Sequence, residues 1–141
     1  MPSATSGSVT TNNSARAVID AGAADVVVTS TFTLGADNTG LVLRESDSSN
    51  YLRFVLTRTS WLLQKTMAGA TTTVATAKST FAVGASHTLS ATLVGANVTL
   101  SVDGAIVGSV DVAFNESATR HGILSSGSGV RSWENFSVRQ P

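Results

Sequence analysis

Alternation of hydrophobic and polar residues is the dominant pattern along this chain. Residues 25–34, 87–94 and 97–103 show it most clearly, with an apolar residue at almost every second position, Ser30 being the exception, and mostly threonine or serine between them. In the first of these stretches Val26 and Val28 fall on one side of a strand and the threonines fall on the other. Because successive side chains of a strand point to opposite faces of a sheet, the pattern predicts β-strands that are buried on one face.

Turn signals divide the chain into short pieces. Asp103-Gly104 directly follows an alternating run and is a strong hairpin signal, while loops are expected near 35–40, 47–50 and 125–129. A helix is plausible only over 112–119, and there for about one turn. We expect eleven or twelve short strands, near residues 8–12, 15–20, 25–34, 40–46, 51–58, 61–67, 71–77, 87–94, 97–103, 105–111, 120–125 and 132–139. Such spacing is typical of an all-β sandwich or barrel.

Composition narrows the possible functions. The chain has 141 residues and no cysteine, which predicts one domain over residues 1–141 and excludes disulfides and thiolate metal sites. Nine basic and nine acidic residues give a net charge of 0, so we expect no nucleic-acid partner. No stretch is long and apolar enough to span a membrane, so we expect no membrane insertion, and the N-terminus lacks a signal-peptide pattern. Residues 1–7 are expected to form a flexible or partner-bound arm.

Three segments carry a family resemblance. Residues 40–54 read GLVLRESDSSNYLRF, residues 87–104 run from His-Thr-Leu to Val-Asp-Gly, and residues 121–138 begin with HGIL and close on WENFSV. In this order they resemble the concanavalin A-like lectin/glucanase superfamily, particularly its laminin G-like and sugar-hydrolase-associated branches. The resemblance covers roughly residues 15–139 and implies a two-sheet antiparallel jelly-roll sandwich. It departs from the family at Ser86, where members usually have tryptophan.

Members of that superfamily usually begin with an additional strand, and this chain starts later. Either that strand is dispensable, or a second copy or another partner supplies it, since unpaired strand edges invite pairing. We expect a homo-oligomer or a part of a larger assembly.

A candidate binding surface follows from the faces of three consecutive strands. If the leucines at 41, 43, 52, 56 and 62 face the core together with the phenylalanine at 54, an exposed sheet face carries the ligand-binding or partner-binding candidates Arg44, Tyr51, Arg53, Trp61 and Lys65. Aromatic rings and arginines on an exposed face suit sugar stacking or a protein interface. In the alternative interpretation Trp61 completes the core and the arginines only solvate the sheet.

Catalytic chemistry finds little support in the sequence. Glycoside hydrolysis requires two carboxylates that flank the scissile bond. Glu45 and Asp47 have the alternate spacing seen in related β-glucanases, but the resemblance places them at a strand end and in a turn. We expect structural or exposed roles for His87 and His121, and no catalytic residue.

Calcium is the one cofactor that the resemblance leaves open, because laminin G-like relatives often bind it with loop oxygens. Asp37, Asn38 and Asp47 are weak candidates, and all three are also ordinary turn formers. No other cofactor is expected.

These observations favour a non-catalytic surface or structural binding module. The first hypothesis is a bacteriophage virion component, such as a capsid decoration or tail-associated protein, which binds a coat or tail protein and has possible glycan adhesion. The alternative is a carbohydrate-binding module from a secreted multidomain bacterial enzyme, and the least favoured is a glycoside hydrolase. The expected location is a virion surface or the extracellular space.

Overall fold

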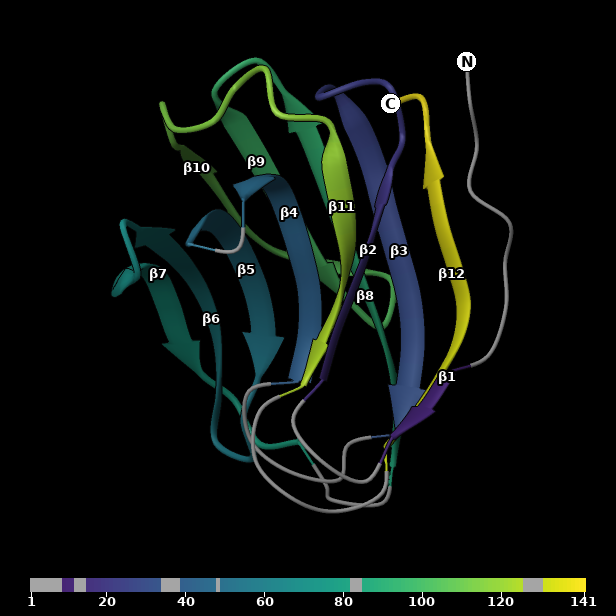
Figure 1. The fold of residues 1–141 in the computed structure, drawn as a ribbon. Coiled ribbons are helices and arrows are strands. Elements are labelled where there is room, and N and C mark those ends of the chain that lie inside the picture. The colour runs from purple at the N-terminus through teal and green to yellow at the C-terminus, as the bar shows by residue number, and fades with distance from the viewer. Residues whose placement is uncertain (1–8, 12–14, 34–38, 48, 82–84, 126–130) are drawn as a thin grey trace.

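The computed structural model describes residues 9–11, 15–33, 39–47, 49–81, 85–125 and 131–141, and these form two packed antiparallel sheets (Figure 1). The strands are β1 (Val9–Thr11), β2 (Ala15–Asp20), β3 (Val26–Thr33), β4 (Thr39–Asp47), β5 (Asn50–Leu56), β6 (Ser60–Met67), β7 (Ala70–Lys78), β8 (Ser86–Val94), β9 (Asn97–Val102), β10 (Ala105–Asp111), β11 (Arg120–Ser125) and β12 (Arg131–Arg139). The first sheet has the order β1-β12-β3-β8-β9-β10 and the second the order β2-β11-β4-β5-β6-β7. This architecture confirms the predicted two-sheet antiparallel jelly-roll sandwich.

The predicted strands agree closely with the twelve observed ones. The Asp103-Gly104 hairpin joins β9 to β10, and both of its residues have a positive φ, 51° and 86°. Residues 112–119 contain a hydrogen-bonded turn, in which the amide of Ala118 donates to the carbonyl of Asn115 at 3.0 Å, but no helix. In the described part of the chain no helix could cross a membrane. The predicted arm, residues 1–7, lies outside the described residues.

The alternating residues of both sheets build the core between them. Val26, Val28 and Phe32 of β3 are buried there together with the alternating leucines of β8, β9, β4 and β5. On the outer face of the first sheet the intervening hydroxyls bond across strands, as between Thr31 and Thr88 at 2.8 Å. The alternation therefore places apolar side chains inside and hydroxyls outside, as strand geometry requires.

A β-bulge interrupts β4 next to its hairpin with β5. Leu43 pairs with Leu52 and Asp47 pairs with Asn50, so three residues of β4 lie opposite Tyr51 alone. Arg44, the first of the three, has a φ of 49°. Because the extra residues break the alternation, side chains beyond Leu43 do not follow the faces that period-2 counting assigns to them.

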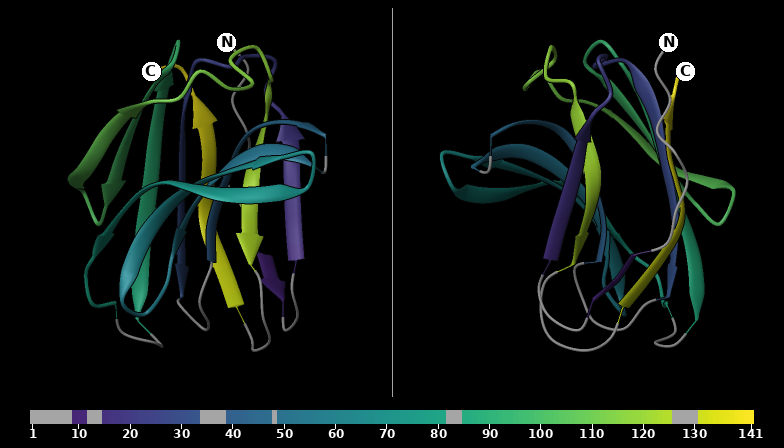
Figure 2. Two further views of the ribbon diagram at one scale, coloured as in Figure 1. Left: turned by 90° about the vertical axis from the view of Figure 1, so that its left-hand side faces the viewer. Right: turned by 45° about the vertical axis from the view of Figure 1, so that its right-hand side comes forward.

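One end of the sandwich is closed by the connection from β10 to β11. There β4 to β7 bend away from the first sheet (Figure 2). The side-chain amide of Asn115 donates to the carbonyls of Arg44 and Asn50, both at 3.0 Å. The connection thus ties itself to the bulge and to the start of β5.

Candidate functional site

Two of the five predicted surface residues lie on the outer face of the second sheet. Tyr51 and Arg53 of β5 are half-buried there, as the alternation predicted. Arg44, Trp61 and Lys65 do not lie on that face, so this placement is wrong for them, and for Trp61 the alternative interpretation, a position in the core, is confirmed.

Trp61 belongs to the core. Its side chain is 6% exposed, and its ring meets Phe54 edge-on with centroids 6.1 Å apart. The pairing of β5 with β6 sets Leu56 opposite Trp61 and Phe54 opposite Leu63, so these four side chains share the inner face. Leu62 consequently points outward, which is the reverse of the prediction.

Lys65 shares the inner side of β6 with Trp61 and Leu63. Its Nζ lies 5.4 Å from the centre of the Phe114 ring, in the connection that closes the end of the sandwich. The contact has the geometry of a cation–π interaction, and the aliphatic part of the Lys65 side chain can cover apolar surface. Lys65 therefore belongs to the closed end of the sandwich and not to the outer face.

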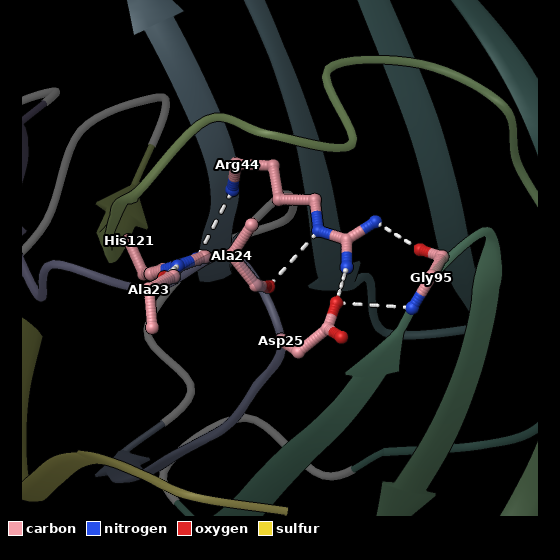
Figure 3. A network of polar contacts seen from close by, with 6 residues as sticks. All are labelled: Ala23, Ala24, Asp25, Arg44, Gly95 and His121. Atoms are coloured by element: carbon pink, nitrogen blue, oxygen red, sulfur yellow. Dashed lines mark hydrogen bonds and ion pairs between the residues drawn. The ribbon is translucent and has the colours of Figure 1, made fainter. Parts of the chain in front are cut away.

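Arg44 is fully buried at the bulge, where it joins the two sheets (Figure 3). Its guanidinium donates to the carbonyl of Ala24 at 3.1 Å, to the carbonyl of Gly95 and to the carboxylate of Asp25 at 2.9 Å. The same Asp25 oxygen accepts the amide of Gly95 at 3.0 Å. Burial lowers the pKa of Arg44, and the adjacent Asp25 carboxylate opposes that shift. Its hydrogen bonds and its ion pair offset the cost of removing the charge from water, which makes Arg44 a structural residue.

His121 of β11 lies beside this network and is also fully buried. Its Nδ1 accepts the amide of Arg44 at 3.1 Å, and its Nε2 lies 3.0 Å from the carbonyl of Ala23 (Figure 3). These partners require a neutral ring that carries its proton on Nε2. Burial lowers the pKa of His121, which also favours the neutral form.

His87 lies in the first sheet, at the start of β8. Its Nδ1 is 3.0 Å from the Asp103 carboxylate of the β9–β10 turn, and its ring meets Phe81 edge-on at 5.4 Å. These contacts fasten the turn to β8, so the geometry gives both histidines structural positions.

The outer face of the second sheet carries a second, smaller apolar cluster. Val42, Val55 and Leu124 are buried there, although they point away from the main core. Val18, Tyr51 and Leu62 pack against them and are partly exposed. The cluster gives this face an apolar floor with the half-buried ring of Tyr51 at its margin.

A row of polar side chains crosses β5, β6 and β7 beside that cluster. The Nε of Arg53 donates to the Oε1 of Gln64 at 2.6 Å, and the Nε2 of Gln64 donates to the hydroxyl of Thr73 at 3.3 Å. Burial lowers the pKa of Arg53. The terminal guanidinium nitrogens of Arg53 make no hydrogen bond to another described residue and can donate to a ligand. Taking Trp61 as a core residue would have placed Leu62 and Gln64 on this face from sequence alone.

Two of the acidic candidates, Asp47 and Glu45, are among the described residues, and both occupy structural positions. Asp47 accepts the amide of Ser49 at 2.8 Å and the side-chain amide of Asn50 at 2.9 Å, and these bonds lower its pKa. Glu45 is buried and lies opposite Arg120 of β11. Among the described residues no group of three or more histidine or acidic side chains could hold a metal ion. Asp37 and Asn38 lie outside the described residues.

The geometry defines a lectin-like jelly roll, and comparison with known proteins agrees with that class. No family model matches the sequence, and no curated protein matches it. Among solved structures the chain is similar to the carbohydrate binding module CBM66 from Bacillus subtilis, with 18% identity, a TM-score of 0.62 and coverage of 95% of this chain and 92% of that one. It is similar to sheep galectin-11, with 11% identity, a TM-score of 0.61 and coverage of 85% and 97%.

Larger enzymes contain the same fold as one part. The fructosyltransferase from A. japonicus matches 99% of this chain with a TM-score of 0.76 and 14% identity, but the match spans 26% of that protein. At these identities the likeness establishes the fold alone. The predicted virion role, coat or tail partners and homo-oligomer gain no support from these structures and stay predictions.

Proposed function

We propose that this domain is a non-catalytic carbohydrate-binding module whose binding surface is the outer face of the second sheet. The row Arg53–Gln64–Thr73 beside the apolar cluster carries the proposal. A sugar ring offers hydroxyls at its rim and apolar C–H groups on its faces, so its site needs oriented polar groups next to apolar surface. The structural likeness to a carbohydrate binding module over nearly the full length of both chains supports this choice.

Each part of the face has a role in this proposal. Tyr51 offers ring surface for stacking against a sugar, and Leu62 extends the apolar floor. The hydrogen bond from Arg53 to Gln64 fixes the plane of the guanidinium group. The direction in which its terminal nitrogens can donate is therefore set as well. A side chain that is already held in place loses less conformational entropy on binding than a free one.

Binding rather than turnover is part of the proposal. A glycosidase needs one carboxyl group as an acid and a second as a base or nucleophile, on opposite sides of the bond. Asp47 is engaged in its turn and Glu45 is buried beside β11, which supports a role without catalysis.

A panel of immobilised plant, fungal and bacterial polysaccharides tests the proposal. We expect at least one glycan to bind, and Arg53→Ala to weaken its binding about tenfold or more, since hydrogen bonds from a charged donor contribute about 1.5–3 kcal/mol. Arg139→Ala, an exposed arginine at the end of β12 in the other sheet, is the matched control and should bind like the wild type. Binding of no glycan, or equal binding by Arg53→Ala, would overturn the proposal. Release of reducing ends from the bound glycan would overturn the non-catalytic part.

A further inference from the structure

The outer face of β5, β6 and β7 carries cations and lacks carboxylates. The segments 50–56, 60–67 and 70–78 contain no aspartate or glutamate. Arg53 and Lys78 lie on the outer face, whereas Lys65 points inward toward Phe114. The acidic residues described in the second sheet gather at the ends of β2 and β4, and they are Asp20, Glu45 and Asp47. An anion on β5 to β7 would therefore meet positive charge without a facing carboxylate.

A polar hollow extends this face toward the start of β6. Its volume is about 920 Å³, and it is lined by Thr59, Ser60, Thr76, Ala77, Lys78, Ser79 and Thr80. Ser60 pairs with Lys78 and Leu62 pairs with Thr76, so these lining residues lie on the same side of the sheet as Leu62 of the apolar floor. Five of its seven lining residues carry hydroxyl groups, which can donate to and accept from sugar hydroxyls.

The two cations are separated by more than one sugar ring. Arg53 lies opposite Gln64 on β6, and Lys78 lies opposite Ser60, four residues away along the same strand. Four residues of a strand span about 13 Å, and β5 and β7 are two strands apart. A ligand that contacts both cations must be an extended chain that lies along β6.

Both cations lack a counter-charge in the described structure. Neither Arg53 nor Lys78 forms an ion pair with a described carboxylate. Arg53 is partly removed from water, and this burial lowers its pKa because the charged form loses hydration. A bound anion would stabilise the charged guanidinium at a site that already bears the cost of desolvation.

From this arrangement we infer that the ligand is an extended anionic glycan, with carboxylate or sulfate groups on different sugar units held by Arg53 and by Lys78. The inference rests on the proposed function and names the class of carbohydrate. The Arg53–Gln64–Thr73 row holds one unit, the apolar floor around Leu62 supports the next, and the hydroxyl-lined hollow with Lys78 holds a further unit. Neutral chains of the same shape would keep the floor contacts and lose both charged ones.

Matched polysaccharide pairs test the inference with the intact domain. Polygalacturonate is compared with its fully methyl-esterified form, and dextran sulfate with dextran, by isothermal titration or affinity electrophoresis. We expect the charged member of at least one pair to bind about tenfold more tightly, and the pair that responds distinguishes carboxylate from sulfate. The affinity should fall as sodium chloride is added, because salt screens exposed charge pairs.

Chain length and Lys78 locate the second contact. Charged oligomers should gain affinity with length until they reach both cations and then level off. Lys78→Gln should weaken long oligomers about threefold to fivefold, as expected for an exposed charge, and leave the shortest binding oligomer unchanged. Arg139→Gln removes one charge from the other sheet and should change neither.

The outcomes separate the two proposals. Equal or tighter binding of the neutral members overturns the anionic inference and leaves the carbohydrate-binding function standing. Tight anionic binding that Lys78→Gln does not alter for any length overturns the second contact. Failure of every charged and neutral glycan to bind overturns the proposed function itself.

Discussion

At the scale of single residues, the side chain of Arg44 contacts three carbonyl or carboxylate groups that come from two separate turns. Asp25 lies just before β3 and Gly95 lies between β8 and β9, so the guanidinium fastens the first sheet to the bulge in β4 of the second. The backbone of Arg44 adopts a φ of 49°, an uncommon value for a residue with a side chain. The network that it makes offsets this local cost.

His121 makes the stability of this network depend on pH. Its folded-state pKa is lowered by burial, so between the ordinary value of 6.5 and that lower value the unfolded chain binds a proton that the folded chain does not. The contribution of His121 to the stability is therefore fully present above about pH 6.5, and it is lost as the pH falls toward the folded pKa. We expect thermal unfolding to shift to lower temperature between about pH 7 and about pH 5.

His121→Gln provides the control for that prediction. The variant should be less stable at neutral pH, because it alters bonds to Arg44 and Ala23, and its unfolding temperature should change less over the same pH interval. Differential scanning calorimetry at several pH values measures both effects. An equal pH dependence in the variant and the wild type would show that other groups carry it.

At the scale of strands, the sequence predicts that each strand exists, but it predicts only part of the pairing register and of which side chains face the core. Single turn signals such as Asp103-Gly104 and long alternating runs define strand limits, because both act within a few residues. Trp61-Leu62-Leu63 is three consecutive apolar residues, so alternation alone assigns them no particular face. The neighbours across the sheet decide the outcome, since Phe54 pairs with Leu63.

The candidate site was likewise predictable where the strand is regular and was not where distant contacts decide which face a residue takes. Tyr51 and Arg53 lie where counting from Leu52 and Phe54 places them, because β5 is regular over that stretch. The predicted position of Arg44 is wrong because a bulge depends on contacts with distant segments, which no local pattern encodes. Gln64 was missed for the same reason that Leu62 was assigned to the core.

The close approach of β4 to β5 at Gly40 makes a strand-scale prediction. A Cβ at this position would overlap the carbonyl oxygen of Phe54 and lie 2.8 Å from the Cα of Val55 and 2.9 Å from a methyl group of Leu89. Two of these atoms belong to the backbone, so the sheet must shift to admit a methyl group. We expect Gly40→Ala to destabilise the domain by about 2–3 kcal/mol in chemical denaturation.

Gly108→Ala is the matched comparison for Gly40→Ala. Its Cβ would meet the ring of Trp61 at 3.1 Å, and a side chain can adjust more easily than a backbone. The cost should therefore be smaller, about 1 kcal/mol. A larger loss at Gly108 than at Gly40 would contradict this order.

At the scale of the whole molecule, the second sheet has apolar clusters on both of its faces. The inner one joins the two sheets, and the outer one, with Val42 and Val55 at its centre, is confined to the second sheet. The inner cluster is needed to hold the sandwich together, whereas the outer cluster adds an apolar floor beneath Tyr51 and Arg53. Stability and binding should therefore respond to different substitutions in the same sheet.

Trp61 and Tyr51 test that separation. Trp61 touches Phe54 in its own sheet and lies against Gly108 of β10 in the other, so Trp61→Phe should lower the free energy of unfolding by about 1–3 kcal/mol. Glycan affinity, measured well below the unfolding temperature, should stay within about twofold of the wild type, because the ring faces away from the proposed surface. Tyr51→Ala should show the opposite result, with a small loss of stability and about tenfold weaker binding, since a half-exposed ring contributes more to stacking than to the core. If Trp61→Phe reduced affinity while the unfolding curve stayed unchanged, the binding surface would have to lie between the sheets rather than on the outer face.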